Sequence, residues 1–483
     1  MSKLLILKTK SGNKYIYDNG SNEIIPYSDI KYDLLQNFKN KSEQELLSIL
    51  NKKYTNISYN KIKYEYDYIN NLYSNKVIID EKEKIYDLQL NKLKNFFFNS
   101  SIFQLILVIT EECNLRCEYC IYSNKYPNIK TYTSNFMSKD IAFKSIDYYM
   151  KLFDEKVKRG FDSDPVISFY GGEPLLNFTL IKEIVAYCKE KYSKYKIKYN
   201  FTTNGILLNE EIINFILRNN MLVTFSLDGD KEEHDRKRKF NNKKGSFDIV
   251  YNNIVKFQEK NSLLKEKIKI NFNCCYDNET NLVKVLDFYK KHENLFNPFH
   301  VSFNKIIDFN TSYYDDKKDD TVLEESLNLL KDKYINNIIN KKNIDPCIES
   351  LFRAFPLMKH RFKGEESFLN NSCFPGGKMC IDYKGNIYMC ERINQQLAIG
   401  NVNEGLNWSN IKLYIEKFIK VYNENCKKCN ISRLCPVCFS ILCKDEDIKI
   451  NKEYCKKQKK SLKKIMEEMY SILELNKSAF DKL

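Results

Sequence analysis

A single loop carries three cysteines within eight residues. Cys113, Cys117 and Cys120 have the spacing C-x3-C-x2-C and follow an apolar run that ends at Thr110. A [4Fe–4S] cluster needs four ligands, so three thiolates from one loop leave one iron open for an exogenous chelator. A zinc site needs a fourth Cys or His, and none follows within this loop. The spacing therefore predicts an iron–sulfur cluster with an open iron.

The C-x3-C-x2-C motif resembles the one that defines the radical S-adenosylmethionine (SAM) superfamily. In that family the open iron binds the amino and carboxylate groups of SAM, and an electron from the cluster cleaves SAM to a 5′-deoxyadenosyl radical. The resemblance implies the same chemistry for Cys113, Cys117 and Cys120. It also implies that Tyr119, inside the motif, contributes to the SAM site.

The sequence Gly171-Gly172-Glu173-Pro174 follows a second apolar run, Val166–Tyr170. Adjacent glycines allow the backbone to approach a ligand, and the carboxylate of Glu173 can pair with a cationic amine. Alone, these four residues are an ordinary turn. At the end of the second strand they resemble the motif that binds the SAM amino group, and we expect Gly171, Gly172 and Glu173 to bind it here.

Two further motifs end later strand-like runs, in the order expected for the superfamily. By resemblance, Asn204 in Thr-Thr-Asn-Gly and Ser226 in Ser-Leu-Asp-Gly lie near the ribose and the methionyl portion of SAM. Arg238, in the stretch His-Asp-Arg-Lys-Arg, has two interpretations. Either it holds the SAM carboxylate, or it belongs to a solvated run of charges.

Nine of the 16 cysteines lie between Cys373 and Cys455, in a segment with little hydrophobic patterning. A segment so poor in core material is typically held together by metal. Its spacing resembles the SPASM domain, which binds two auxiliary [4Fe–4S] clusters in peptide-modifying radical SAM enzymes. Carried over, the pattern gives one cluster the ligands Cys373, Cys380, Cys390 and Cys438. It gives the other the ligands Cys426, Cys429, Cys435 and Cys455.

The chain departs from the SPASM pattern at one place. Two residues separate Cys435 from Cys438, where the pattern has three, so Cys443 is an alternative ligand to Cys438. Two full clusters are arithmetically allowed, and so is one cluster with an open iron that binds a substrate thiolate. A zinc ribbon over Cys426–Cys438 is the alternative to iron.

Glu391 stands directly after Cys390. Sulfatase-maturing relatives place a catalytic Asp after the corresponding Cys, so the resemblance implies that Glu391 accepts a proton beside an auxiliary cluster. A plain surface carboxylate is the alternative. Cys274 and Cys275 are adjacent on a strand-like run, so one of them points into the barrel, where packing is the expected role and substrate contact the alternative.

Apolar strand-like runs alternate with helical patterns between residues 100 and 306. The expected strands are Gln104–Thr110, Val166–Tyr170, Ile197–Thr202, Leu222–Leu227, Ile268–Tyr276 and Phe299–Ile306. The helices expected between them are Lys139–Phe153, Thr179–Ser193, Glu210–Asn219, Phe247–Lys260 and Asn281–His292. Six β/α units predict an α/β fold, a partial (β/α)6 TIM barrel in which functional residues gather at the carboxyl ends of the strands.

Residues 1–95 contain no cysteine and differ in composition from the barrel segment. Their order is expected to be β-β-α-α-β, with elements at Leu4–Thr9, Lys14–Tyr17, Glu43–Lys53, Asn60–Tyr73 and Lys76–Ile79. This predicts a winged-helix-like module. It resembles the recognition element with which ribosomal peptide maturases capture a leader peptide as an added strand. The alternative is a structural cap on the enzyme core.

The remainder of the chain divides into three parts. We expect a charged, helical linker over 307–365 and the Cys-rich SPASM domain over 366–458. A basic C-terminal helix is expected over 459–483.

The composition indicates a globular protein without membrane spans. The longest apolar run falls far short of the roughly 20 residues that a span needs. The N-terminus has no secretory signal, so we expect a cytoplasmic protein whose cysteines bind metal instead of forming disulfides. With only four His residues, sulfur is the dominant ligand. The formal charge of +15 comes from lysines spread along the whole chain, which favours an acidic peptide over nucleic acid as partner.

Together the motifs predict a radical SAM oxidoreductase that acts on a peptide. Auxiliary clusters suit the removal of an electron from a substrate radical, which favours net oxidation. The stretches 373–377 and 390–393 resemble maturases of Cys-rich peptides, so our hypothesis is thioether (sactionine) formation between a Cys sulfur and a carbon. The alternatives are carbon–carbon or carbon–oxygen crosslinking, epimerisation, and formylglycine formation by a sulfatase-maturing enzyme. The expected partners are the precursor peptide and a ferredoxin- or flavodoxin-like electron donor.

Overall fold

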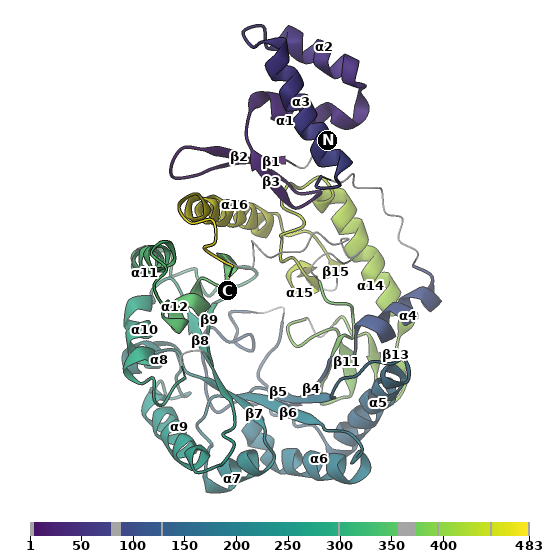
Figure 1. Ribbon diagram of the computed structural model, residues 1–483. Helices are drawn as coiled ribbons and strands as arrows, with labels where there is room; N and C mark the ends of the chain where they lie inside the picture. The colour runs from purple at the N-terminus through teal and green to yellow at the C-terminus, as the bar shows by residue number, and fades with distance from the viewer. Residues whose placement is uncertain are drawn as a thin grey trace.

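The computed structural model describes residues 4–78, 88–126, 129–297, 300–355, 369, 372–393, 396–444 and 447–481. At its centre is a curved sheet whose core is six parallel strands (Figure 1). They are β4 (Gln104–Thr110), β5 (Val166–Gly171), β6 (Lys198–Thr203), β7 (Leu222–Ser226), β8 (Ile270–Tyr276) and β9 (Val301–Lys305). Each strand pairs with the next in chain order. This confirms the predicted partial barrel, although Phe299 of the last expected strand lies outside the described residues.

Helices connect the strands and cover the outer face of the sheet (Figure 1). They are α5 (Lys139–Lys158), α6 (Phe178–Lys191), α7 (Glu210–Arg218), α8 (Lys231–Lys237), α9 (Phe247–Ser262) and α10 (Leu282–Lys291). Buried residues recur at helical spacing, as Ile212, Ile213 and Ile216 do in α7. α8 is not predicted from the sequence, because KEEHDRK has no apolar residue to reveal a periodicity.

The Cys-rich segment continues the barrel sheet instead of standing apart from it. β10 (Lys378–Ile381) pairs in parallel with β4. Antiparallel strands follow beyond it, namely β11 (Asn386–Tyr388), β12 (Gly400–Asn401) and β13 (Gly405–Leu406). Cys380 on β10 is thereby aligned with Ile106 of β4, the strand that leads into the Cys113 loop. The elements that complete the segment are α14 (Trp408–Val421), α15 (Phe439–Leu442), β14 (Cys443–Lys444) and β15 (Asp447–Ile448).

Helices also form the linker and the C-terminus. The linker contains α11 (Thr321–Ile339) and α12 (Pro346–Leu351), while its residues 356–365 lie outside the described part. The C-terminal helix α16 (Lys452–Leu475) begins before residue 459, because the Asn451 side chain caps it by accepting from the Tyr454 N–H. No helix in the described ranges is both long enough and apolar enough to cross a membrane.

Residues 4–78 form a module with its own hydrophobic core. Its elements are β1 (Leu4–Lys8), β2 (Lys14–Asp18), β3 (Glu23–Pro26), α1 (Asp29–Asn37), α2 (Glu43–Lys53) and α3 (Tyr59–Ser74). The order is therefore β-β-β-α-α-α, and the expected order β-β-α-α-β is wrong. The third strand is short and ends in a proline, which hides it in the sequence. The described residues of the expected strand Lys76–Ile79 form a turn, and Ile79 lies outside the described part.

The module's core ends at Ile78, ahead of the expected boundary at residue 95. The next helix, α4 (Leu90–Ser100), packs instead on the barrel and the Cys-rich segment, where the ring of Phe97 lies 5.4 Å from that of Trp408. The module is seated above α16 in Figure 1. Glu474 of α16 accepts hydrogen bonds from Thr9 and Tyr15 at 3.0 and 2.8 Å.

A second contact joins the module to the Cys-rich segment. The buried side chain of Asn19, after β2, donates to Ser432 Oγ at 2.9 Å and accepts from the Arg433 N–H at 3.0 Å. Ser432 and Arg433 lie in the loop between Cys429 and Cys435. The module is therefore bonded directly to a loop of expected cluster ligands.

Candidate functional site

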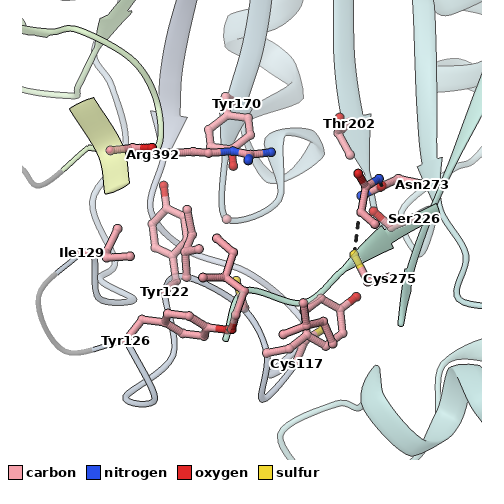
Figure 2. Close-up of a pocket in the computed structure, with 18 of the residues that line it drawn as sticks. Cys117, Tyr122, Tyr126, Ile129, Tyr170, Thr202, Ser226, Asn273, Cys275 and Arg392 are labelled. Atoms are coloured by element: carbon pink, nitrogen blue, oxygen red, sulfur yellow. Dashed lines mark hydrogen bonds between the residues drawn. The ribbon is translucent and has the colours of Figure 1, made fainter. Parts of the chain in front are cut away.

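A cavity of about 580 Å³ opens at the carboxyl ends of the barrel strands. Its lining includes the three cysteines of the C-x3-C-x2-C loop and every residue expected to contact SAM. Those residues are Tyr119, Gly171, Gly172, Glu173, Asn204, Ser226 and Arg238. Figure 2 shows Ser226 and Cys275 on one side of the cavity, with Tyr170 and Arg392 across from them. The structure thus gathers residues that are far apart in the sequence.

The glycine pair is required by the backbone beside it. Gly171 has φ +142°, and a Cβ there would stand 1.9 Å from the Thr110 carbonyl oxygen. A Cβ on Gly172 would stand 2.1 Å from the Glu112 carbonyl oxygen and 3.0 Å from Cys113 Cβ. Any side chain at either position would therefore displace the loop that carries the cysteines. The glycines position that loop, which is a role that the sequence does not reveal.

Glu173 is buried, and both of its carboxylate oxygens accept hydrogen bonds. Oε1 accepts from the Leu175 N–H at 3.1 Å and from Thr203 Oγ1 at 2.8 Å, and Oε2 accepts from the Asn204 N–H at 2.8 Å. Burial raises the pKa of Glu173, and these hydrogen bonds oppose that rise. A carboxylate has about four lone pairs, so one is left for a cationic amine in the cavity.

Asn204 joins the end of β6 to the cysteine loop. Its side-chain amide donates to Asn114 Oδ1 at 2.7 Å and lies 3.8 Å from Cys113 Sγ. Its Oδ1 accepts from the Ile206 N–H at 3.0 Å, which fixes the orientation of the amide. Ser226, at the end of β7, is nearly buried and lines the same cavity.

Arg238 is buried, so the interpretation as a solvated charge is wrong. Its guanidinium donates to the Tyr119 hydroxyl, which in turn donates to Asp228 Oδ2 at 2.8 Å. Arg238 Nε is buried and has no hydrogen-bond partner in the described part of the chain. A buried N–H without an acceptor costs free energy, so this donor fits an anionic ligand in the cavity. The carboxylate of SAM is such a ligand.

The residues just before Arg238 fix α8 against β8. Arg236 donates to both oxygens of Asp277, at 3.0 and 2.6 Å. Burial raises the pKa of Asp277, but the hydrogen bonds and charge of Arg236 outweigh it and hold the pKa well below its usual range. His234 accepts from the Asp228 N–H at 3.3 Å through Nδ1, and burial lowers its pKa so that it stays neutral. The charged stretch is therefore an internal scaffold for Arg238.

Cys275 also lines the cavity, whereas Cys274 is fully buried. Cys275 is thus the one of the pair that faces the barrel interior, and Cys274 lies on the opposite face of β8 and contacts Tyr289 of α10. The amide of Asn273 lies 3.8 Å from Cys275 Sγ, and burial raises the pKa of Cys275 to about 12. The sequence also did not reveal Asp228 as a site residue, or the aromatic wall in which Tyr122 and Tyr132 stack at 5.6 Å.

A second cavity, of about 330 Å³, is lined by four cysteines. They are the four that the sequence groups as one cluster, Cys426, Cys429, Cys435 and Cys455. Cys426 follows α14, and Cys455 lies in the first turn of α16. We call this space the outer cavity.

Four more cysteines lie close to the main cavity. Cys438 and Cys443 line it, and Cys380 and Cys390 line an adjoining space of about 10 Å³. Burial, together with the nearby Cys390 and Cys438 thiols, raises the pKa of Cys443 to about 12. Cys443 is therefore a neighbour of Cys438, as its interpretation as an alternative ligand requires.

Cys373, the remaining expected ligand, is exposed. The preceding residue, Ser372, accepts a hydrogen bond from the Phe439 N–H at 3.3 Å. That bond brings the chain at Cys373 beside Cys438. We call these five cysteines the inner group, namely Cys373, Cys380, Cys390, Cys438 and Cys443. The inner group offers five thiols for the four ligand positions of a cluster.

Glu391 lies near Cys380 and Cys390 and also near Tyr170 of the main cavity. Its Oε2 is buried and has no hydrogen-bond partner among the residues described. Burial raises the pKa of Tyr170, which lines the cavity, and the nearby Glu391 charge raises it further. An unpartnered carboxylate oxygen in this place fits a proton acceptor better than a hydrated surface group.

The donor sets fit iron–sulfur clusters. The three sets consist of thiols, which are the usual protein ligands of [4Fe–4S] clusters. In the described ranges, no three His, Cys, Asp or Glu side chains are close enough to hold a single metal ion. A zinc ribbon needs such a tight group, whereas a cluster of several atoms holds its thiolates farther apart. The outer cavity has room for such a cluster between its four thiols.

Comparisons with known proteins match the same region. The model of the Radical SAM superfamily matches residues 107–289. The chain is 28% identical to the cysteine-type anaerobic sulfatase-maturating enzyme of Clostridium novyi (strain NT), over 69% of this chain and 87% of that enzyme. It is 24% identical to the radical SAM cyclopropyl synthase TigE of Paramaledivibacter caminithermalis (strain DSM 15212 / CIP 107654 / DViRD3), over 76% of this chain and 75% of TigE.

A solved structure has the same fold. Native anSMEcpe with bound AdoMet and Cp18Cys peptide is 21% identical and has a TM-score of 0.56, covering 78% of this chain and 99% of that one. The family match spans most of the barrel that forms the main cavity, including the three-cysteine loop. Residues 107–289 are therefore a radical SAM domain, and the protein is an enzyme that uses SAM and [4Fe–4S] clusters.

Proposed function

We propose that this enzyme forms thioether crosslinks in a ribosomally made, Cys-containing precursor peptide, each joining a Cys sulfur to a carbon. One observation carries the proposal. Cys438, an expected ligand of the inner auxiliary cluster, and Cys443 line the same cavity as the SAM-binding residues. When bound, SAM and its cluster supply a 5′-deoxyadenosyl radical that abstracts a hydrogen atom from carbon. A peptide in this cavity therefore lies beside both the sulfur-rich inner group and the SAM site.

The residues divide between three tasks. The SAM cluster is held by Cys113, Cys117 and Cys120, and SAM by Tyr119, Gly171, Gly172, Glu173, Asn204, Ser226 and Arg238. The inner cluster is held by Cys373, Cys380, Cys390 and Cys438, with Cys443 as the alternative ligand. The outer cluster is held by Cys426, Cys429, Cys435 and Cys455. Glu391 accepts the proton of the substrate thiol, because its free oxygen is buried near Tyr170 at the cavity wall.

The N-terminal module captures the leader of the peptide as an added strand. One edge of its sheet is covered, since the N–H groups of Lys8 and Lys10 donate to Glu467 and Ser471 of α16. The other edge is β3, which pairs only with β2 among the described strands. An unpaired edge strand offers backbone donors and acceptors to an extended peptide. The leader therefore adds to β3.

The relatives support a peptide substrate, because the anSMEcpe structure contains a bound peptide. They also favour a second candidate, the oxidation of a Cys or Ser to formylglycine, since the C. novyi relative is a sulfatase-maturating enzyme. Crosslinking at carbon or epimerisation is a third candidate. The recognition module favours a leader-bearing precursor over a sulfatase.

The test is the mass of a short Cys-containing peptide, encoded beside this gene, after anaerobic co-expression with the enzyme. Thioether formation predicts the loss of two hydrogen atoms per crosslink and one thiol that no longer alkylates for each. The same mass loss with every thiol free would indicate a carbon–carbon or carbon–oxygen link. Conversion of a Cys or Ser to an aldehyde would indicate formylglycine and contradict the proposal.

A further inference from the structure

One face of α16 presents lysines to the outer cavity. Lys452, Lys456 and Lys459 line that cavity together with its four cysteines. They follow the spacing i, i+4, i+7, so they share one side of the helix. All three are exposed. We call them the lysine face.

The lysine face has no carboxylate partner among the described residues, unlike the lysines next to it on α16. Lys457 pairs with Asp308 at 3.4 Å and Lys463 pairs with Glu467 at 3.7 Å. No ion pair within the described ranges engages the lysine face. Like charges held together on one surface raise the free energy of the unbound protein and attract an acidic partner.

The same face lies next to expected cluster ligands. Lys459 lines the outer cavity together with Cys426 and Cys455. Cys426, Cys429 and Cys455 are partly buried, and Cys435 is buried. The outer cavity is therefore lined by expected cluster ligands and by exposed lysines together.

We propose that the lysine face is the docking surface of a small acidic protein that carries single electrons on a flavin or an iron–sulfur group. Docking there places the carrier against the outer cluster, on whose presence the inference rests. One electron crosses in each encounter, so one partner is oxidised and the other reduced by one electron, and no bond forms or breaks. Charge on the lysine face speeds and orients the encounter.

The test measures binding instead of turnover. Oxidised flavodoxin is titrated into the cluster-loaded enzyme by calorimetry, at low and at physiological salt. Lys452→Glu/Lys456→Glu/Lys459→Glu is expected to weaken binding about tenfold at low salt and to flatten its salt dependence. The matched control, Lys189→Glu/Lys256→Glu/Lys290→Glu, makes the same change in net charge on exposed positions of α6, α9 and α10. The affinity of this control for flavodoxin is expected to stay within about twofold of that of the wild type.

Iron content and dithionite-driven 5′-deoxyadenosine formation, which needs no carrier, show separately that each variant is intact. If the triple variant loses iron, Lys452→Glu/Lys456→Glu keeps Lys459 and is expected to weaken binding in the same direction. Wild-type affinity in the lysine-face variants would overturn the proposal, and so would an equal loss in the control. A wild-type enzyme without iron at the outer cysteines would overturn it together with the ligand assignment. None of these outcomes depends on the product made from the peptide.

Discussion

The side-chain amide of Asn204 donates a hydrogen bond of 2.7 Å to Oδ1 of Asn114, inside the cysteine loop. Asn204 also gives its backbone N–H to Glu173, so one residue links the loop, the GGEP motif and the end of β6. Three segments from different β/α units are thereby held in one arrangement. The SAM site is organised by hydrogen bonds within the protein before any ligand enters.

Replacing Asn204 by Ala removes the amide and leaves Asn114 without its partner. We expect the KM for SAM to rise about tenfold, as the loss of one well-aligned hydrogen bond at a ligand site predicts. The measurement is dithionite-driven 5′-deoxyadenosine formation at varied SAM concentration. The control is Asn200→Ala on the same strand, where the side chain accepts from Ser168 instead. Equal effects of both changes would contradict the assignment of Asn204.

Changing Cys113, Cys117 and Cys120 together to Ala should abolish 5′-deoxyadenosine formation. The C-terminal cysteines lie in separate groups, so about two-thirds of the iron should remain bound. Iron analysis and product chromatography on the anaerobically reconstituted variant test both points. A triple variant that still cleaves SAM would show that the cluster loop has been misassigned.

Replacing Arg238 by Lys keeps a positive charge but removes the buried Nε donor. We expect the KM for SAM to rise about tenfold or more, because an ammonium cannot reproduce the guanidinium geometry toward a carboxylate. Arg218→Lys, on the exposed end of α7, is the control and should leave the KM unchanged. An unchanged KM in Arg238→Lys would exclude a carboxylate contact through Nε.

Replacing Asp277 by Asn should destabilise the barrel by about 2 kcal/mol at neutral pH, because it breaks the bond pair with Arg236. The folded pKa of Asp277 lies below its ordinary value of 3.8, so its stabilising contribution is present above that pH and is lost as the pH falls below it. The difference in free energy of unfolding between wild type and Asp277→Asn should therefore shrink as the pH falls from about 7 to about 3. Hydrogen exchange of the β8 amides in urea measures the free energy of unfolding of each protein. If the difference between the two free energies did not change with pH, the ion pair would be contradicted.

A precursor peptide that adds to the module should protect the amides of β3. We expect exchange at Ile24, whose N–H points away from β2, to slow roughly tenfold when the peptide is added. The β1 amides serve as an internal control, because α16 already covers that edge. Protection of β1 and not of β3 would place the leader elsewhere.

Much of the barrel was predictable because its strands are apolar runs that alternate with helical patterns. The grouping of Cys426, Cys429, Cys435 and Cys455 was expected from the resemblance to the SPASM domain, and these four cysteines line one cavity. β10–β13 were not, because they are short, contain Gly400 and Gly405, and acquire their register by pairing with β4 and with one another. That pairing joins segments far apart in the sequence, so no local pattern predicts it.

Charge gave the least reliable prediction. The stretch that ends at Arg238 has the composition of a surface segment, yet Lys237 and Arg238 are nearly buried and Arg236 is bonded to Asp277. The partners that neutralise these charges come from β8 and its following turn, some forty residues away in sequence. Long-range pairing of this kind leaves no mark on the local sequence, and the burial of Arg238 could be found only from the fold.

The contact between Asn19 and the Ser432–Arg433 loop has a consequence for damaged enzyme. That loop runs from Cys429 to Cys435, and α16, which contacts the β1–β2 hairpin, has Cys455 in its first turn. Both supports of the N-terminal module therefore meet at the proposed outer cluster site. Oxygen that destroys this cluster would loosen both supports together. We expect enzyme that has lost this cluster to bind the precursor peptide more weakly. Inactive enzyme would then not compete with active enzyme for the peptide.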